Sequence, residues 1–138
     1  MSPQANITRR ITFSASHRLH NDALSKEENL AIFGKCNNIN GHGHNFIVEV
    51  TVGGEIDPKN GMVYNLRNLK DVMVDVIEQG LDHKHLNLDV PEFKSLVPTA
   101  ENIAVVIWNR LTQRLPVGAL YEVKLIETEN NFVTYRGA

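Results

Sequence analysis

The sequence predicts an α+β fold in which two helices cover one face of a four-stranded antiparallel sheet. Residues 7–19 and 42–53 alternate between apolar and polar side chains, which is typical of half-buried strands. Residues 66–79 and 98–115 carry apolar side chains at helical spacing. Two shorter strands near the C-terminus complete the order strand, strand, helix, helix, strand, strand. Their ranges are 121–128 and 132–136.

The first predicted strand places His17 at the end of an apolar row that includes Phe13 and Ala15. A single histidine in such a position is more often a satisfied core residue than a ligand. A short helix is predicted after it, because Ser25 and Glu28 form a capping box and Gly34 ends the segment.

The second predicted strand opens with His42 and His44, which point to the same face because side chains alternate along a strand. An H-x-H pair alone is a weak indication of a metal site. If the first two strands pair as antiparallel neighbours, His17 joins the pair. Three imidazoles satisfy zinc and leave a fourth position open, as catalytic sites do.

The rest of the chain follows in order. Asn65 is a candidate N-cap for the first long helix and Gly80 its C-cap, and the loop 81–91 follows. In that loop Lys84 and His85 are expected to be solvated. Thr99 opens the second long helix, with Glu101 in its first turn, and Pro116 ends it. Residues 129–131 are predicted to form a hairpin turn.

Three further residue types suggest proton chemistry near such a metal. Cys36 is a candidate base, because a nearby cation favours the thiolate. The alternative is that it serves as a fourth ligand, which would close the site. The Asp82–His83 pair has a carboxylate that orients an imidazole, although such pairs are common in surface loops. Glu127 ends an apolar row, where a carboxylate either meets a specific partner or reaches solvent.

Composition and charge restrict the other classes of function. The chain has 138 residues, a length that suits a single domain covering residues 1–138. A net charge of −2 gives no reason to expect nucleic acid or an anionic membrane as partner. One cysteine excludes an internal disulfide, and residues 1–10 hold no long apolar run. We expect a soluble, cytoplasmic domain with a small-molecule substrate.

Seven stretches in the right order resemble the 6-pyruvoyl-tetrahydropterin synthase family. The resemblance covers nearly the whole chain beyond its first ten residues. Departures from the vertebrate pattern are His85, Asn87, Glu92 and Ala100, which replace a typical Asn, Asp, Tyr and hydroxyl residue. The matching stretches are residues 11–19, 33–38 with 42–44, 81–84, 89–91, 101–102, 115–121 and 127–128.

The resemblance implies a lyase that converts 7,8-dihydroneopterin triphosphate to 6-pyruvoyl-tetrahydropterin with loss of triphosphate, in tetrahydrobiopterin biosynthesis. By motif match, zinc would be held by His17, His42 and His44. Cys36 would be the base, assisted by Asp82 and His83. Glu127 would bind the pterin ring, with Thr99 and Glu101 near the same pocket. Mg²⁺ is expected to accompany the triphosphate.

The resemblance also implies the T-fold, in which trimers close their sheets into a β-barrel and two trimers stack as a homohexamer with sites between subunits. Two alternatives stay open. One is 6-carboxy-tetrahydropterin synthase, in which the cysteine usually stands four residues before the first histidine of H-G-H. Here Cys36 stands six residues before His42. The other is a non-catalytic zinc or pterin-binding module in which Cys36 ligates the metal.

Overall fold

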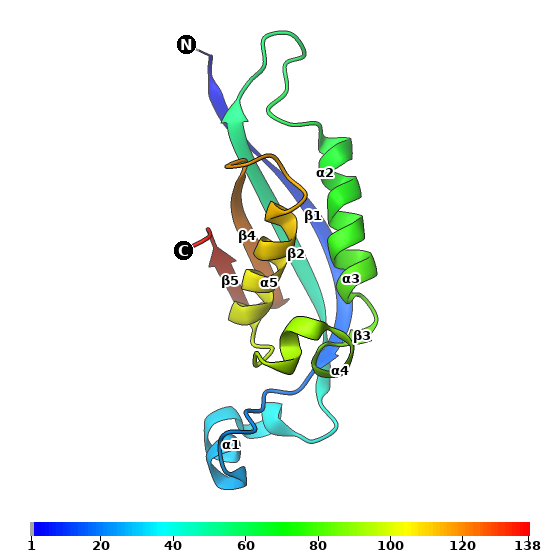
Figure 1. The fold of residues 1–138 in the computed structure, drawn as a ribbon, viewed down its shortest axis with the longest axis vertical. Helices are drawn as coiled ribbons and strands as arrows, with labels where there is room; N and C mark the ends of the chain where they lie inside the picture. Colours follow the sequence, from blue (N-terminus) through cyan, green and yellow to red (C-terminus); the bar gives the residue numbers. More distant parts are fainter. Residues whose placement is uncertain (1) are drawn as a thin grey trace.

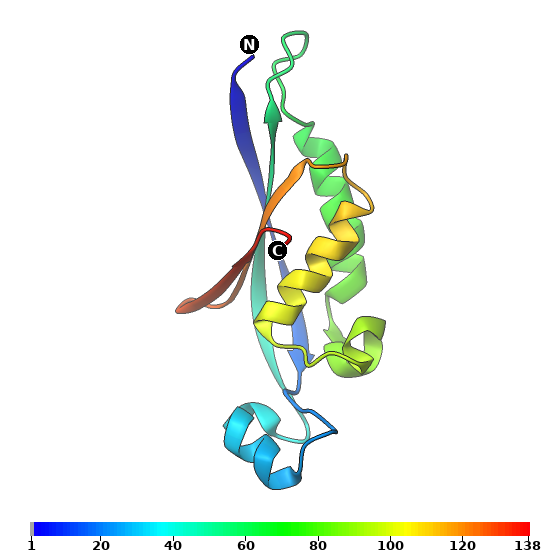
Figure 2. The same ribbon diagram turned by 60° about the vertical axis from the view of Figure 1, so that its left-hand side comes forward.

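The computed structural model describes residues 2–138, and a twisted sheet with helices on one face is its main feature (Figures 1 and 2). The strands are β1 (Gln4–His17), β2 (His42–Glu55), β3 (Lys84–His85), β4 (Leu120–Thr128) and β5 (Asn131–Tyr135). Their order in the sheet is β3-β1-β2-β4-β5. The α+β class is as predicted.

The expectation of four antiparallel strands is wrong, because the sheet has five strands and is mixed. β3 pairs with β1 in parallel, through Ala15 with Lys84 and Ser16 with His85. The other neighbours are antiparallel. The sequence analysis assigned Lys84 and His85 to a solvated loop, since two residues are too few to show a strand period. Both are in fact half-buried at the edge of the sheet.

The pairing of β1 with β2 runs antiparallel over their full length, from Gln4 with Glu55 to His17 with His42. This confirms the predicted partnership of the first two strands. The register sets Ala15 opposite His44 and Phe13 opposite Phe46. The rings of Phe13 and Phe46 stack with centroids 4.8 Å apart, so an apolar pair lies directly beneath the histidine end of the sheet.

The helices lie against the apolar face of the sheet, as Figure 2 shows. One continuous helical segment comprises α2 (Leu66–Met73), the π-helical turn η2 (Val74–Glu78) and α3 (Gln79–Leu81). The second long helix is α5 (Ala100–Thr112). Fully buried side chains from both sides form the core. They include Phe46, Val48, Leu69, Met73, Ile77, Ile103, Ile107 and Leu125.

Gly80 does not end its helix, contrary to the sequence analysis. The helix continues through Leu81, and Asp82 is the C-cap in extended conformation. A side chain at Gly80 would place its Cβ 2.8 Å from Nη1 of Arg110 on α5. The glycine therefore leaves room for the guanidinium of Arg110 against the helix and does not end the helix.

Shorter helical elements connect the strands and the long helices. The segment α4 (Leu86–Asp89) and the 3₁₀ turn η3 (Pro91–Lys94) connect β3 to α5. Between β1 and β2, α1 (Lys26–Phe33) and the 3₁₀ turn η1 (Gly34–Asn37) form a lobe beyond the end of the sheet (Figure 1). The predicted capping box of Ser25 and Glu28 opens α1. Among residues 2–138, no helix has the length and apolar character that crossing a membrane requires.

Candidate metal centre

Three histidines meet where β1 ends and β2 begins. Each of His17, His42 and His44 offers a ring nitrogen, and these nitrogens all lie within 4.8 Å of one another. His17 Nε2 and His42 Nε2 are 3.1 Å apart. The strand register explains this convergence, because His17 is paired with His42, and His44 lies two residues further along the same face. The prediction that these three side chains come together is confirmed.

A backbone carbonyl fixes the orientation of His17, whose side chain is 1% exposed. Nδ1 of the ring lies 2.7 Å from the Pro98 oxygen, so Nδ1–H donates to that carbonyl and Nε2 keeps its lone pair towards the other two histidines. Metal-binding histidines usually have such a partner behind them, and it determines which nitrogen is free. The sequence contains no signal for this contact, because the acceptor is a backbone group 81 residues away.

Burial lowers the pKa of two of these histidines, His17 and His42. Removal of His17 from water, reinforced by the neighbouring imidazoles, lowers its pKa from 6.5 to about 4 in spite of the Pro98 hydrogen bond. Burial is also the main cause that lowers the pKa of His42, followed by the proximity of His44. Neutral imidazoles are the protonation state that binds metal ions. His44 Nε2 is buried without a hydrogen-bond partner among the described residues, so it is available as a ligand.

Glu127, near the end of β4, approaches the same cluster. Its Oε2 lies 3.9 Å from His17 Nε2, and its side chain is 23% exposed. The carboxylate counteracts the burial of His42, since its charge raises the pKa of that residue. Of the two readings that the sequence left open, solvent or a specific partner, the geometry favours the histidine cluster.

Cys36 lies in η1, in the lobe beyond the sheet, and is half-buried. Its carbonyl accepts from the Leu19 N–H at 2.9 Å, which ties η1 to the chain after β1. The group of mutually close ligand atoms in residues 2–138 contains the three histidines and not the thiol of Cys36. In this arrangement Cys36 is not among the candidate metal ligands.

Asp82 and His83 lie at the edge of β1, between α3 and β3. Asp82 accepts from the Ser14 N–H through Oδ1 at 2.7 Å, and its Oδ2 lies 2.8 Å from His83 Nδ1. The His83 N–H donates to the Ser14 carbonyl at 2.6 Å, and His83 adopts a left-handed φ of 61°. Both backbone groups of Ser14 therefore hold the pair in place. The Ser14 N–H is the main cause that lowers the pKa of Asp82.

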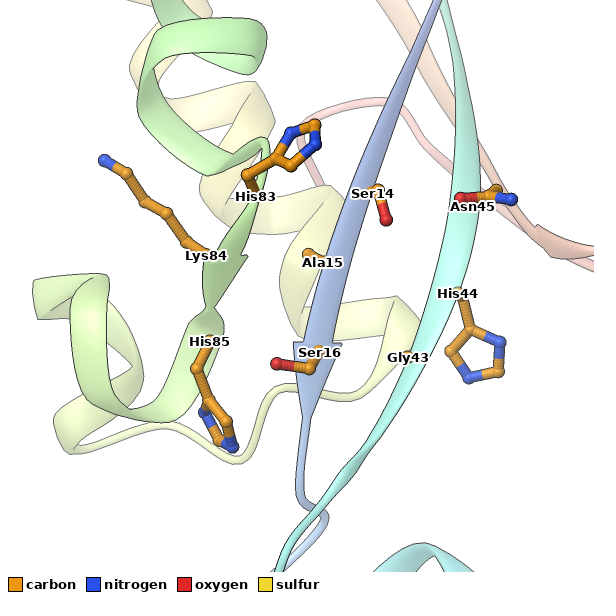
Figure 3. Close-up of a pocket in the computed structure, with 9 residues that line it drawn as sticks. All are labelled: Ser14, Ala15, Ser16, Gly43, His44, Asn45, His83, Lys84 and His85. Atoms are coloured by element: carbon orange, nitrogen blue, oxygen red, sulfur yellow. The ribbon is translucent and has the colours of Figure 1, made fainter.

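His83 shares a surface pocket with His44. Figure 3 shows His83, Lys84 and His85 on one side of β1 and His44, from β2, on the other. The ring of His83 is 84% exposed, so it is open to a ligand or to another chain. Cys36 is not among the residues that line this pocket.

Thr99 and Glu101 occupy the start of α5. The Thr99 hydroxyl accepts from the Asn102 N–H at 3.2 Å and so serves as the N-cap. Glu101 follows in the first turn and is exposed. This confirms the predicted helix start, which directly follows the Pro98 carbonyl that orients His17.

His85 is a residue of this region that the sequence analysis dismissed. It lines the pocket of His44 and also a second cavity beyond it. Its Nδ1 is buried without a hydrogen-bond partner in residues 2–138. The spacing of His83 and His85 repeats the H-x-H pattern and was the only available signal, but a two-residue strand gave it no context.

The fold and the site define an α+β domain with a candidate three-histidine metal site. Comparison with known proteins agrees. The family model for 6-pyruvoyl tetrahydropterin synthase matches residues 6–138. The 6-pyruvoyl tetrahydrobiopterin synthase of Homo sapiens is 61% identical over 134 residues, which are 97% of this chain and 92% of that protein. Its counterpart in Dictyostelium discoideum is 50% identical over 99% of both chains.

A solved structure supports the same assignment. The 6-pyruvoyl tetrahydropterin synthase of Caenorhabditis elegans superposes with a TM-score of 0.96 at 44% identity, covering 99% of this chain and 98% of that one. This chain belongs to the 6-pyruvoyl tetrahydropterin synthase family, and it is by that membership a lyase. The family predicted from the sequence motifs is therefore confirmed.

Proposed function

We propose that this chain catalyses the zinc-dependent conversion of 7,8-dihydroneopterin triphosphate to 6-pyruvoyl-tetrahydropterin, with loss of triphosphate. The observation that carries the proposal is the juxtaposition of the three-histidine cluster with the Glu127 carboxylate, 3.9 Å from His17 Nε2. A carboxylate that accepts hydrogen bonds from a pterin ring would hold the side chain of the substrate over the metal position.

The residues present fit zinc. Three imidazoles form a donor set typical of catalytic zinc, and the buried Nε2 of His44 lacks any other partner in residues 2–138. Zinc in this position would polarise hydroxyl and carbonyl oxygens of the substrate side chain and so acidify the neighbouring C–H bonds. Mg²⁺ is proposed as the counterion of the triphosphate.

We assign the remaining roles to residues of this chain as follows. Glu127 accepts hydrogen bonds from the ring N–H groups of the pterin, near Thr99 and Glu101. Cys36 Sγ takes a proton from the side-chain carbon next to the one that carries the triphosphate. The C–H electron pair then forms a C=C bond, and the C–O bond breaks with its electron pair leaving on the triphosphate oxygen. Asp82 holds the His83 imidazole through its 2.8 Å contact with Nδ1, which directs Nε2 outward for proton exchange.

We further propose that residues 1–138 form one T-fold domain, and that six copies assemble in the cytoplasm as two stacked trimers. Two features support sites between subunits. Cys36 does not line the pocket that holds His83 and His44. Large apolar side chains are also exposed on the lobe and on β5. They are Leu30, Ile32, Ile39 and Phe132, at 58–78% exposure.

The test is an assay of Cys36→Ala against the unmodified chain with dihydroneopterin triphosphate, with zinc measured in both proteins. The proposal expects zinc to stay at one ion per chain and triphosphate release to collapse. Loss of zinc together with the thiol would make Cys36 a ligand and refute the role of base. Alkylation of the zinc-loaded protein gives a second measure, since a metal-bound thiol resists labelling and a free thiolate reacts fast.

A further inference from the structure

A second cavity adjoins the metal centre, with a volume of about 460 Å³. It lies between the residues that follow β1 and the segment from β3 to η3. Arg18, which follows His17, lines it, and so does Val97, which precedes the Pro98 carbonyl that orients His17. His85 lines both this cavity and the pocket of His44, so the two spaces are neighbours.

Arg18 is held rigidly at this cavity. Its backbone N–H donates to Asn87 Oδ1 and its carbonyl accepts from Asn87 Nδ2, both at 2.8 Å. Its side-chain Nε donates to the Asn37 carbonyl at 3.0 Å. The two Asn87 bonds fix the backbone of Arg18, and the single bond from Nε orients the guanidinium and leaves its two terminal amino groups for a ligand. Because Asn87 is an amide, the clamp does not neutralise the arginine.

Other hydrogen-bond donors and a second positive charge line the same cavity as Arg18. Lys94 is exposed and has no carboxylate within salt-bridge distance among residues 2–138. His85 brings the buried Nδ1 that lacks a partner. His20 completes the group, with Nε2 3.1 Å from Asp22 Oδ1. Asp22 is the acidic side chain at this cavity, and it is fully exposed and paired with His20.

A fixed arginine, an exposed lysine and imidazoles around an open cavity are donor types that bind phosphate oxygens. Arginine forks onto phosphate oxygens with geometric fit, and lysine supplies a mobile point charge. A volume of several hundred Å³ is in the range of ligand pockets. We propose that this cavity binds the triphosphate group of the substrate, with Arg18 and Lys94 as its charged anchors. The inference rests on the proposed function, since it assigns the leaving group of that reaction.

The experiment measures binding of inorganic triphosphate to the zinc-loaded protein by calorimetry. We expect Arg18→Gln to weaken binding about tenfold or more, and Lys94→Glu about tenfold. Dihydroneopterin, which lacks the triphosphate, is expected to bind all variants with unchanged affinity. Lys59→Ala is the matched control, because Lys59 is an exposed lysine in the turn after β2, away from this cavity, and its triphosphate affinity should stay within twofold.

Lys94→Glu is the second variant, in case Arg18→Gln does not fold. The Lys94 side chain makes no hydrogen bond that its replacement would break. With the full substrate, we expect kcat/KM of Lys94→Glu to fall by at least the same factor, because negative charge on the departing triphosphate grows in the transition state. If both variants bind triphosphate as tightly as the wild type, and the wild type converts the substrate, the assignment of this cavity to triphosphate is wrong. The proposed function is then unaffected. A wild type that binds triphosphate through Arg18 and Lys94 but converts no dihydroneopterin triphosphate would refute the function and keep the anion site.

Discussion

Replacement of Asp82 by Asn separates the structural from the catalytic role of the Asp82–His83 pair. The carboxylate accepts two hydrogen bonds, from the Ser14 N–H at 2.7 Å and from His83 Nδ1–H at 2.8 Å. The asparagine carbonyl oxygen can still accept the first bond, although without the charge. Its NH₂ group cannot accept the second. His83 then loses the partner that fixes its tautomer and ring orientation.

The stability change is expected to be small. A hydrogen bond to a charged group contributes about 1.5–3 kcal/mol, and the one-quarter exposure of Asp82 places both bonds at the lower end of that range. With one bond weakened and one lost, we expect Asp82→Asn to lower the free energy of unfolding by about 1.5 kcal/mol in urea denaturation. Turnover of the zinc-loaded enzyme should fall by about 100-fold or more, because a misoriented imidazole no longer assists proton transfer.

Asp75→Asn is the control for this prediction. Asp75 Oδ2 lies 3.0 Å from Arg114 Nη2, and both side chains are about half exposed. This variant should change stability by less than about 0.5 kcal/mol and leave turnover intact. If Asp82→Asn shows the stability loss but turns over within threefold of the unmodified enzyme, the pair only clips α3 to β1 and its catalytic assignment is wrong.

Three further predictions concern the metal centre and the core beneath it. Gly41→Ala should lower both stability and zinc affinity, because φ is +75° and the new Cβ would lie 2.9 Å from the His17 carbonyl oxygen. Gly61→Ala is the control, because Gly61 has a similar φ of +73° but nothing within 4 Å of the new Cβ. It should show only the cost of the backbone conformation, about 1 kcal/mol, and keep zinc binding. The metal-free protein should lose up to about 3 kcal/mol of unfolding free energy as the pH falls from 6.5 to about 4. The cause is that His17 binds a proton in the unfolded chain over this pH range but stays neutral in the folded chain. A free energy of unfolding that does not change with pH in urea denaturation would contradict the lowered pKa. Phe46→Ala should cost about 3–5 kcal/mol, because the ring is fully buried and stacked on Phe13, and calorimetric melting of the variant checks this value.

The parts of the fold in which a periodic pattern of apolar residues extends over many residues were predictable from the sequence. Alternation over β1 and β2 determines which side chains share a face, and a slip of one residue would expose the whole apolar row. The pairing of His17 with His42 followed from that pattern and from the antiparallel arrangement. The capping residues Ser25, Asn65 and Thr99 also act as predicted, because each cap is a local interaction.

Interactions between distant segments could not be predicted in this way. β3 has only two residues, and it forms because Asp82 and His83 bind Ser14 and align the following chain with β1. Gly80 has the composition of a C-cap, but its real neighbour is Arg110, which is 30 residues further along the chain. Alternation along β4 left open whether Glu127 meets solvent or a partner, and the pairing of β4 with β2 shows that it approaches the histidines.

The lobe between the metal ligands has a consequence for the local opening of the chain. Within α1 and η1 the only buried side chain is Asn29, which bonds to Asn21 and to the Ser25 carbonyl. A segment with so little buried apolar surface opens at low free energy, independently of the core. The segment that contains the lobe begins after His17 and ends before His42. A metal ion bound to both histidines would hold the two ends of this segment together and reduce the conformational entropy gained when the segment opens. Zinc held by both histidines would therefore stabilise α1 without touching it, and the amides of α1 should exchange with deuterium more slowly once zinc is added.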